Sequence, residues 1–111
     1  MKLHEQGQLL RIFIGESAKH EGKPLYEAIV QKAKELELAG ATVTRGISGF
    51  GPQSKIHTTK FLRLSVDAPL VIEIVDSEEY IQRILPFLDE VVANGLITLE
   101  KVQVIKYESR Q

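Results

Sequence analysis

The sequence predicts an α+β fold of the ferredoxin-like type, a sandwich in which two helices cover one face of a four-stranded antiparallel sheet. Three observations lead to this prediction. Short segments with alternating apolar residues, typical of strands, are separated by two longer segments with helical periodicity. The elements follow the order β-α-β-β-α-β, which is the signature of a split βαβ domain. The 111 residues suffice for one core, so we expect a single domain over residues 1–111.

The first half of the chain is predicted to form a strand, a helix and a second strand. Apolar residues alternate over Gln8–Ile14, as they do in a strand with one buried face. The helix is expected over Pro24–Leu38, because proline suits the first helical position and an apolar stripe follows it. Gly40 fits the left-handed residue beyond the helix end. The second strand is expected over Ala41–Ser48, with Gly46 as a bulge.

A third strand and the second helix follow. The strand is expected to begin within Phe61–Val66 and to run through Leu70–Val75, with Pro69 at an edge or a break because it cannot donate to a ladder. Asp76 as N-cap and Glu79 three residues later approximate a capping box. The apolar stripe of this helix has a 3.6-residue period and comprises Ile81, Ile84, Leu85, Leu88, Val91 and Val92.

The last strand is expected over Ile97–Tyr107, and Pro86 is expected to kink or loosen the preceding helix. The helices leave the other face of the sheet uncovered. If this face is apolar, we expect it to form an oligomer interface. The candidate residues for this face are Phe13, Val43, Ile105 and Tyr107.

Composition excludes several classes of function. A hydrophobic content of 43% with 26% charged residues is typical of a soluble globular protein. The net charge of −1 argues against bulk attraction to nucleic acid or to a membrane surface. The chain has no cysteine, which excludes disulfides, thiolate metal sites and cysteine nucleophiles. We see neither a signal-peptide core nor an apolar run of about 20 residues, and therefore expect a cytoplasmic protein.

Three glycines mark the end of the second strand, in the stretch TVTRGISGFGPQ, and a basic loop follows. Glycines bring backbone N–H groups close to a ligand, and consecutive N–H groups form nests that hold anions. An anion site is therefore one interpretation, and a strand with a bulge and an exposed turn is the other. The glycines are Gly46, Gly49 and Gly51, and the basic loop contains Lys55, His57, Lys60 and Arg63, with no acid before Asp67.

The chain resembles the PII signalling superfamily, and most closely its short PII-like branch in bacteria and archaea. Gly49–Gln53, GFGPQ, matches the Gly-Phe-Gly-x-Gln motif that precedes the flexible T-loop of PII proteins. Ile72–Val75, IEIV, followed by the acidic Asp76–Glu79, matches their third strand and the start of their second helix. Element order and chain length agree as well, so the resemblance covers nearly the whole chain.

The resemblance implies a homotrimer whose sheets face inward, with an adenine nucleotide in each of three clefts between subunits. In PII proteins the Gly-Phe-Gly segment and the following Gln line one side of the cleft. A Gly-rich loop before the last strand comes from the neighbouring subunit. Carried over by position, together with nearby glycines and cations, the candidate nucleotide-binding residues are Gly46, Gly49, Phe50, Gly51, Gln53, Lys55, Gly95, Leu96 and Lys106.

Departures from the PII pattern remove cations. Leu96 stands where PII proteins have Lys, and the loop before it is shortened to Asn94–Gly95. Leu70 replaces a phosphate-binding Lys, and only Lys106 and Arg110 lie near the position of the C-terminal Arg-x-Arg. Charge-assisted hydrogen bonds contribute about 1.5–3 kcal/mol each, so we expect AMP or ADP to be favoured over ATP. The basic loop can compensate in part, and its lack of tyrosine excludes uridylylation there.

The sequence thus favours a regulatory binding protein, not an enzyme, whose loop Pro52–Arg63 responds to the nucleotide and contacts an unidentified target. In PII systems the target is often a membrane transporter or a metabolic enzyme. The alternatives are a trimeric adaptor without a nucleotide and, more remotely, a phosphate-ester enzyme. An RNA-binding RRM shares the element order, but Leu70–Val75 lacks the base-stacking aromatics it needs. The three histidines lack metal-ligand spacing, and no Ser-His-Asp arrangement is evident.

Overall fold

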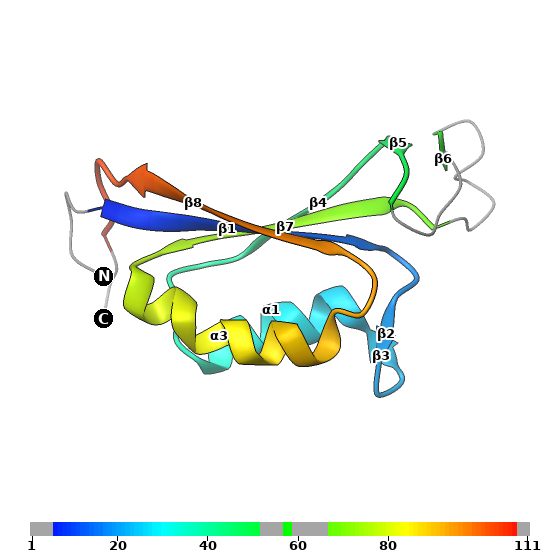
Figure 1. Ribbon diagram of the computed structural model, residues 1–111, viewed down its shortest axis with the longest axis horizontal. Helices are drawn as coiled ribbons and strands as arrows, with labels where there is room; N and C mark the ends of the chain where they lie inside the picture. Colours follow the sequence, from blue (N-terminus) through cyan, green and yellow to red (C-terminus); the bar gives the residue numbers. More distant parts are fainter. Residues whose placement is uncertain (1–5, 52–56, 59–66, 109–111) are drawn as a thin grey trace.

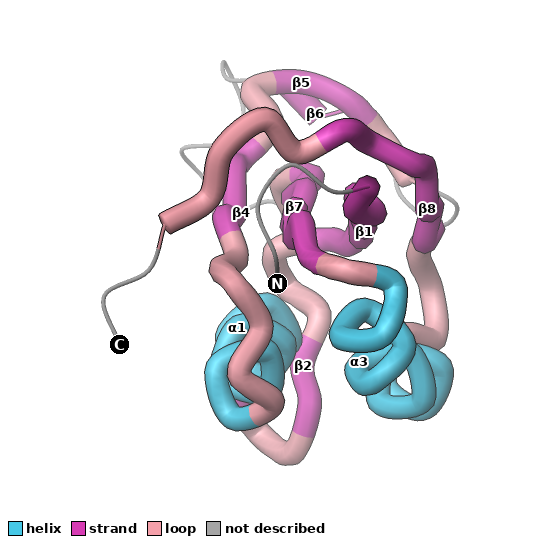
Figure 2. The backbone as a smooth tube through the Cα atoms, turned by 90° about the vertical axis from the view of Figure 1, so that its left-hand side faces the viewer, coloured by secondary structure: helices cyan, strands magenta, loops and turns pink. Residues whose placement is uncertain are grey.

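The computed structural model describes residues 6–51, 57–58 and 67–108. Two helices lie side by side beneath one face of a twisted four-stranded sheet (Figures 1 and 2). The predicted α+β architecture is confirmed. The elements are β1 (Gln6–Gly15), β2 (Lys19–His20), β3 (Lys23–Pro24), α1 (Leu25–Glu35), β4 (Thr42–Arg45), β5 (Ser48–Gly49), β6 (His57–Thr58), β7 (Pro69–Asp76), α3 (Glu78–Val91) and β8 (Leu96–Gln103).

The strand order in the sheet is β4-β7-β1-β8, with every neighbouring pair antiparallel. Ile12 in β1 lies opposite Ile72 in β7 and Ile97 in β8. Val43 in β4 also lies opposite Ile72. Residues directly opposite one another in an antiparallel ladder share a face. The four therefore point toward the helices, and the prediction that Val43 lies on the other face was wrong.

The core forms between the helix-facing side of the sheet and the inner faces of the helices. The predicted alternation in β1 is confirmed, because Leu10 and Ile12 are fully buried. Each helix contributes one apolar stripe, as a 3.6-residue period requires. The buried core comprises Leu10, Ile12, Ile14, Leu25, Ile29, Ala33, Leu70, Ile72, Ile74, Ile81, Ile84 and Leu88.

The ends of the first helix differ from the prediction by one to three residues. Pro24 is the N-cap, so the helix begins one residue later than expected, and it ends at Glu35. The left-handed residue is Glu37, with φ 63°, and Gly40 is not in that region. The helix stops early enough that the chain turns at Glu37, before it reaches the glycine.

The N-cap of α3 is Ser77, whose Oγ accepts a hydrogen bond from Tyr80 N at 3.4 Å, so the expected capping box opened by Asp76 was wrong. Asp76 instead ends β7 with its side chain only 1% exposed. Its Oδ2 accepts a hydrogen bond from Ala39 N at 2.8 Å, and its Oδ1 accepts one from Ser77 N at 2.7 Å. This carboxylate ties the α1–β4 connection to the start of α3, which continues through Pro86.

Several strand ends also differ from the sequence-based boundaries. β4 ends at Arg45, so Gly46 lies just beyond a strand and is not a bulge within it. Pro69 is the first residue of β7, where its missing donor is tolerated. β8 ends at Gln103, well before the expected Tyr107. The expected start of the third strand within residues 61–66 lies outside the described residues.

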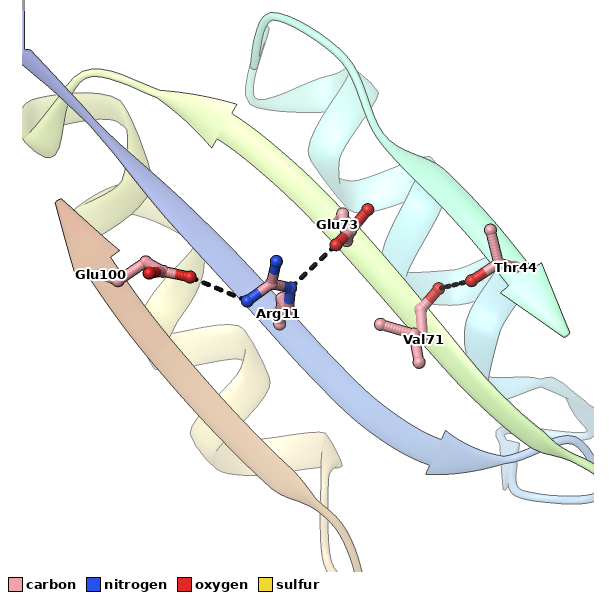
Figure 3. Close-up of polar contacts among 5 residues, drawn as sticks. All are labelled: Arg11, Thr44, Val71, Glu73 and Glu100. Carbon is pink, nitrogen blue, oxygen red and sulfur yellow. Dashed lines mark hydrogen bonds and ion pairs between the residues drawn. The ribbon is translucent and has the colours of Figure 1, made fainter. Parts of the chain in front are cut away.

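The sheet face opposite the helices combines charged and apolar side chains, and no helix among the described residues covers it (Figure 2). At its centre Arg11 donates from Nε to Glu73 Oε2 at 2.8 Å and from a terminal nitrogen to Glu100 Oε1 at 2.7 Å (Figure 3). The side-chain hydrogen bond to Glu73 is the main reason that the pKa of Arg11 is raised above its ordinary value. Half-buried apolar residues, among them Leu9 and Phe13, flank this network.

No helix in the described ranges is both long enough and apolar enough to cross a membrane.

Candidate functional site

A cavity of about 740 Å³ lies at one end of the sheet. Its lining residues come from the end of β1, the starts of β7 and β8, and the segment that follows β5. These strand ends lie at the right in Figure 1. Its lining residues are Phe13, Ile14, Gly15, Ser17, Ala18, Phe50, Gly51, Asp67, Pro69, Leu70, Val71, Asn94, Gly95 and Leu96.

Two glycines allow the backbone segments around this cavity to approach one another closely. A Cβ on Gly95 would lie 2.6 Å from the backbone oxygen of Phe13, which is too close for any larger residue. A Cβ on Gly46 would lie 2.8 Å from Pro69 Cγ, and Gly46 N donates to the backbone oxygen of Pro69 at 2.7 Å. The glycines thus bring the β4–β5 and α3–β8 connections against the ends of the central strands.

Asp67 supplies the main polar group of the cavity. Its Oδ1 accepts a hydrogen bond from Ser17 N at 2.8 Å. A Cβ on Gly15 would lie 2.4 Å from Asp67 Oδ2, so the glycine provides the space in which the carboxylate lies. A backbone bond from Glu16 N to Ala68 O at 2.8 Å holds the same two segments together. Asp67 is therefore held at the junction between the end of β1 and the start of β7.

The charge of the cavity is negative as far as the described residues define it. Among the lining residues in the ranges 6–51 and 67–108, Asp67 is the one ionisable side chain, and none is a lysine, arginine or histidine. Arg45, at the end of β4, is close in sequence to the lining residues Phe50 and Gly51. Its guanidinium pairs with Glu16 instead, since Nε donates to Glu16 Oε1 at 3.1 Å. The cavity walls are otherwise mostly apolar, with Ser17 and Asn94 as neutral polar residues.

The structure brings four of the predicted site residues to this cavity. Phe50 and Gly51, from the GFGPQ segment, and Gly95 and Leu96, from the start of β8, all line it. Phe50 is 68% exposed and Leu96 is 55% exposed, which leaves apolar surface open at the cavity mouth. The two segments are more than 40 residues apart in sequence and meet within one chain.

The other candidates are placed around or away from the cavity. Gly46 contacts Pro69 in its wall, and Gly49, with φ 150°, pairs with His57 in the β5–β6 ladder. Gln53 and Lys55 lie outside the described residues. Lys106 follows β8, whose last residues pair with the start of β1, so it lies at the opposite end of the sheet. Its side chain is 72% exposed and lies 4.0 Å from Glu108.

Sequence reasoning missed most of the wall residues. Phe13 was expected only on the uncovered face, and Ser17, Asp67, Pro69 and Asn94 were not assigned to a site. One signal was present, because Asp67 is the first acid after the basic loop. Where a side chain lies in a wall depends on contacts between distant segments, such as Ser17 with Asp67, which local periodicity does not encode. Within the described ranges, acidic and histidine side chains form no cluster that could hold a metal ion.

Comparison with protein-family models identifies the family. The DUF190 family, described as "Uncharacterized ACR, COG1993", matches residues 7–104. The chain belongs to the DUF190 family. A UPF0166 protein of Aquifex aeolicus is 48% identical over 100 residues, covering 88% of this chain and 92% of its own length. A UPF0166 protein of Methanocaldococcus jannaschii is 41% identical over 105 residues, covering 94% and 96%.

Solved structures confirm the fold of this DUF190 chain. CPII of Thiomonas intermedia K12, bound to ADP and bicarbonate, superimposes with a TM-score of 0.68 at 18% identity, covering 91% of this chain and 90% of CPII. A second CPII structure, of a nitrogen regulatory PII-like protein bound to ADP, AMP and bicarbonate, gives a TM-score of 0.65 with the same identity and coverage. The resemblance to PII-like proteins is thereby confirmed for the fold.

Proposed function

We propose that this DUF190 protein is a PII-like regulatory protein that binds an adenine nucleotide, AMP or ADP in preference to ATP, at the cavity at the end of the sheet. The observation that carries the proposal is that Phe50 and Gly51 of the GFGPQ segment line the same cavity as Gly95 and Leu96. These are the two segments that the PII resemblance implicates in nucleotide binding. CPII, which shares the fold, is bound to ADP and AMP.

The size and chemistry of the cavity suit a nucleoside. Small-molecule sites typically occupy about 300–1,000 Å³ and are lined mainly by apolar groups with a few polar ones. The cavity, at about 740 Å³, falls in this range. Its apolar walls provide surface for a flat base, with Phe13 and Phe50 among the lining residues. The base and ribose therefore occupy the cavity in the proposed complex, and the phosphates lie toward its mouth.

The preference for few phosphates follows from the charges. A polyphosphate needs cationic partners, since each charge-assisted hydrogen bond contributes about 1.5–3 kcal/mol. The lining residues that the structure describes include a carboxylate, Asp67, and no cation. Lys55, Lys60 and Arg63 lie in the segment that joins the lining residues Gly51 and Asp67, and they contribute to phosphate binding in this proposal.

The proposed assembly is a homotrimer with the uncovered sheet faces packed together. Arg11, Glu73 and Glu100 form a network at the centre of that face, and apolar residues such as Leu9 and Phe13 flank it. The ion pairs partner the charges of this face within one chain, and the apolar residues around them supply the surface that neighbouring copies cover in this proposal. Trimer formation would set the cavity mouth beside a neighbouring subunit and so complete an intersubunit cleft.

Regulation in this proposal runs through the loop at residues 52–63, the counterpart of the T-loop. The nucleotide lies beside Gly51, directly before this loop, and binds the two states of the loop with different affinity. The loop then engages or releases a target protein, of which a membrane transporter is one candidate. Because adenine nucleotides are the signal, we expect the protein to act in the cytoplasm.

Isothermal titration of the purified protein with AMP, ADP, ATP and cyclic AMP tests the proposal. We expect saturable binding of about one AMP or ADP per subunit and weaker binding of ATP. Light scattering in the same buffer is expected to give three times the mass of one chain. Absence of binding by all four nucleotides would refute the sensor function and favour a trimeric adaptor.

A matched pair of glycine variants locates the site. Gly51→Val adds a branched side chain at the cavity wall and is expected to abolish nucleotide binding. Gly40→Val makes the same change at an exposed glycine where a Cβ meets nothing within 4 Å, and is expected to bind normally. Equal affinities for the two variants would contradict the assignment of the cavity.

A further inference from the structure

The carboxylate of Asp67 is held in the cavity wall by the segment at the end of β1. Ser17 N donates to Oδ1 at 2.8 Å, and Gly15 leaves the space that Oδ2 occupies. Asp67 is half-buried, at the start of the segment that leads into β7. Among the hydrogen bonds within the described part of the chain, the one from Ser17 is the single bond that Asp67 accepts. The hydrogen bond fixes the position of the carboxylate, and a carboxylate accepts up to about four hydrogen bonds, of which the described residues supply one.

A ligand that fills the cavity removes water from this carboxylate. A charged acceptor that loses its water without gaining a donor weakens binding strongly. Among the lining residues within the ranges 6–51 and 67–108, the others are apolar or neutral, and none is a cation. A ligand that supplies an O–H or N–H donor at this point offsets the lost hydration of the carboxylate.

We propose that Asp67 is a specificity-determining residue, whose carboxylate accepts a hydrogen bond from a hydroxyl or amino group of the nucleoside part of the ligand. This inference rests on the proposed function and adds to it which end of the nucleotide enters the cavity. An adenine nucleoside carries donors of both kinds, the ribose hydroxyls and the exocyclic amine. Acidic side chains accept hydrogen bonds from ribose hydroxyls in other nucleotide-binding folds.

The same carboxylate repels a phosphate group that lies beside it in the cavity. Phosphate groups at neutral pH carry negative charge and offer few donors, so they meet repulsion where a nucleoside meets an acceptor. Asp67 thus orients the nucleotide with its nucleoside inward and its phosphates toward the mouth. Repulsion also grows with the number of phosphates, in the same direction as the expected preference for AMP or ADP.

The test pairs a protein variant with altered ligands. Asp67→Asn keeps the size of the side chain and an oxygen that can accept from Ser17 N, but it removes the charge. Titrations of the wild type and of Asp67→Asn would use adenosine, 2′-deoxyadenosine, 3′-deoxyadenosine and N6,N6-dimethyladenosine. The deoxy compounds remove one hydroxyl donor each, and the dimethyl compound removes the amine donor, so the arms distinguish the ribose from the base.

We expect the wild type to bind one of the three altered nucleosides about tenfold more weakly than adenosine, as loss of a hydrogen bond to a charged group implies. In Asp67→Asn that difference should shrink to about twofold, because the partner of the missing donor is itself altered. The affinity of Asp67→Asn for ATP relative to adenosine should rise. A purely structural role of Asp67 would change the affinities for all four nucleosides by one common factor.

The outcomes separate the two proposals. If the wild type binds AMP but binds all three altered nucleosides as tightly as adenosine, the role of Asp67 is refuted while the nucleotide site stands. The inference is also refuted if Asp67→Asn changes the affinities for all ligands by one common factor, so that the ratio of the affinity for ATP to that for adenosine stays unchanged. If the wild type binds neither nucleosides nor nucleotides, the proposed function fails, and the inference fails with it. The wild-type comparison needs no variant, so it can refute the inference even if Asp67→Asn folds poorly.

Discussion

Replacement of Asp76 by alanine is expected to destabilise the fold strongly. The side chain is 1% exposed and accepts hydrogen bonds from Ala39 N and Ser77 N at 2.8 and 2.7 Å. Hydrogen bonds to charged groups contribute about 1.5–3 kcal/mol each, and Asp76→Ala leaves two backbone donors without this acceptor. We therefore expect a loss of about 3–4 kcal/mol, out of a total of about 5–15 kcal/mol for a typical domain.

Urea unfolding followed by circular dichroism, at one fixed protein concentration, measures this loss. With a slope of about 1.5 kcal/mol per molar, the midpoint of Asp76→Ala should fall by about 2 M. Asp76→Asn keeps one acceptor oxygen and should fall between the wild type and the alanine variant. Asp89→Ala, at an exposed acidic residue of α3, serves as the control and should shift the midpoint little. If Asp76→Ala and Asp89→Ala unfold alike, the carboxylate does not hold the α1–β4 connection as we argue.

Three further predictions concern the cavity and the uncovered face. Gly95→Ala forces a Cβ to within 2.6 Å of a β1 backbone oxygen and should cost about 1–3 kcal/mol in thermal unfolding, whereas Gly40→Ala should not. Arg11→Ala leaves its two carboxylate partners facing each other, so light scattering should show loss of the trimer; Arg83→Ala, on the surface of α3, should remain trimeric. Leu96→Lys adds a cation at the cavity, and titration should show ATP gaining about tenfold relative to AMP.

The arrangement of helices and strands was predictable because periodicity records burial. Alternation in β1 and the 3.6-residue stripe of α3 identify the faces that pack together, and residues such as Leu10 and Ile84 are fully buried as those patterns require. The same reasoning failed for Val43, since a short strand with one apolar residue carries no alternation from which its face can be deduced. Register with Ile72, which the sequence does not specify locally, decides it.

Element ends were less predictable, because capping depends on which of several suitable residues the tertiary structure uses. Asp76 and Ser77 are both good N-caps by residue type. The backbone N–H of Ala39, 37 residues away in sequence, engages the aspartate, and the serine then caps the helix. The glycine expected to end α1 is likewise not used, since the chain turns at Glu37.

The candidate site was partly predictable for a related reason. Motif matching identified Gly51 and Gly95, because the PII motifs place glycines in both segments. The structure brings both glycines to one cavity. It did not identify Asp67, because the role of a carboxylate depends on what lies opposite it, here Ser17 N, 50 residues away. The motif therefore indicates where a ligand can lie, whereas the long-range contacts determine its chemistry. A cavity with the PII-like fold but with a carboxylate in place of cations is expected to select for the nucleoside and against additional phosphates.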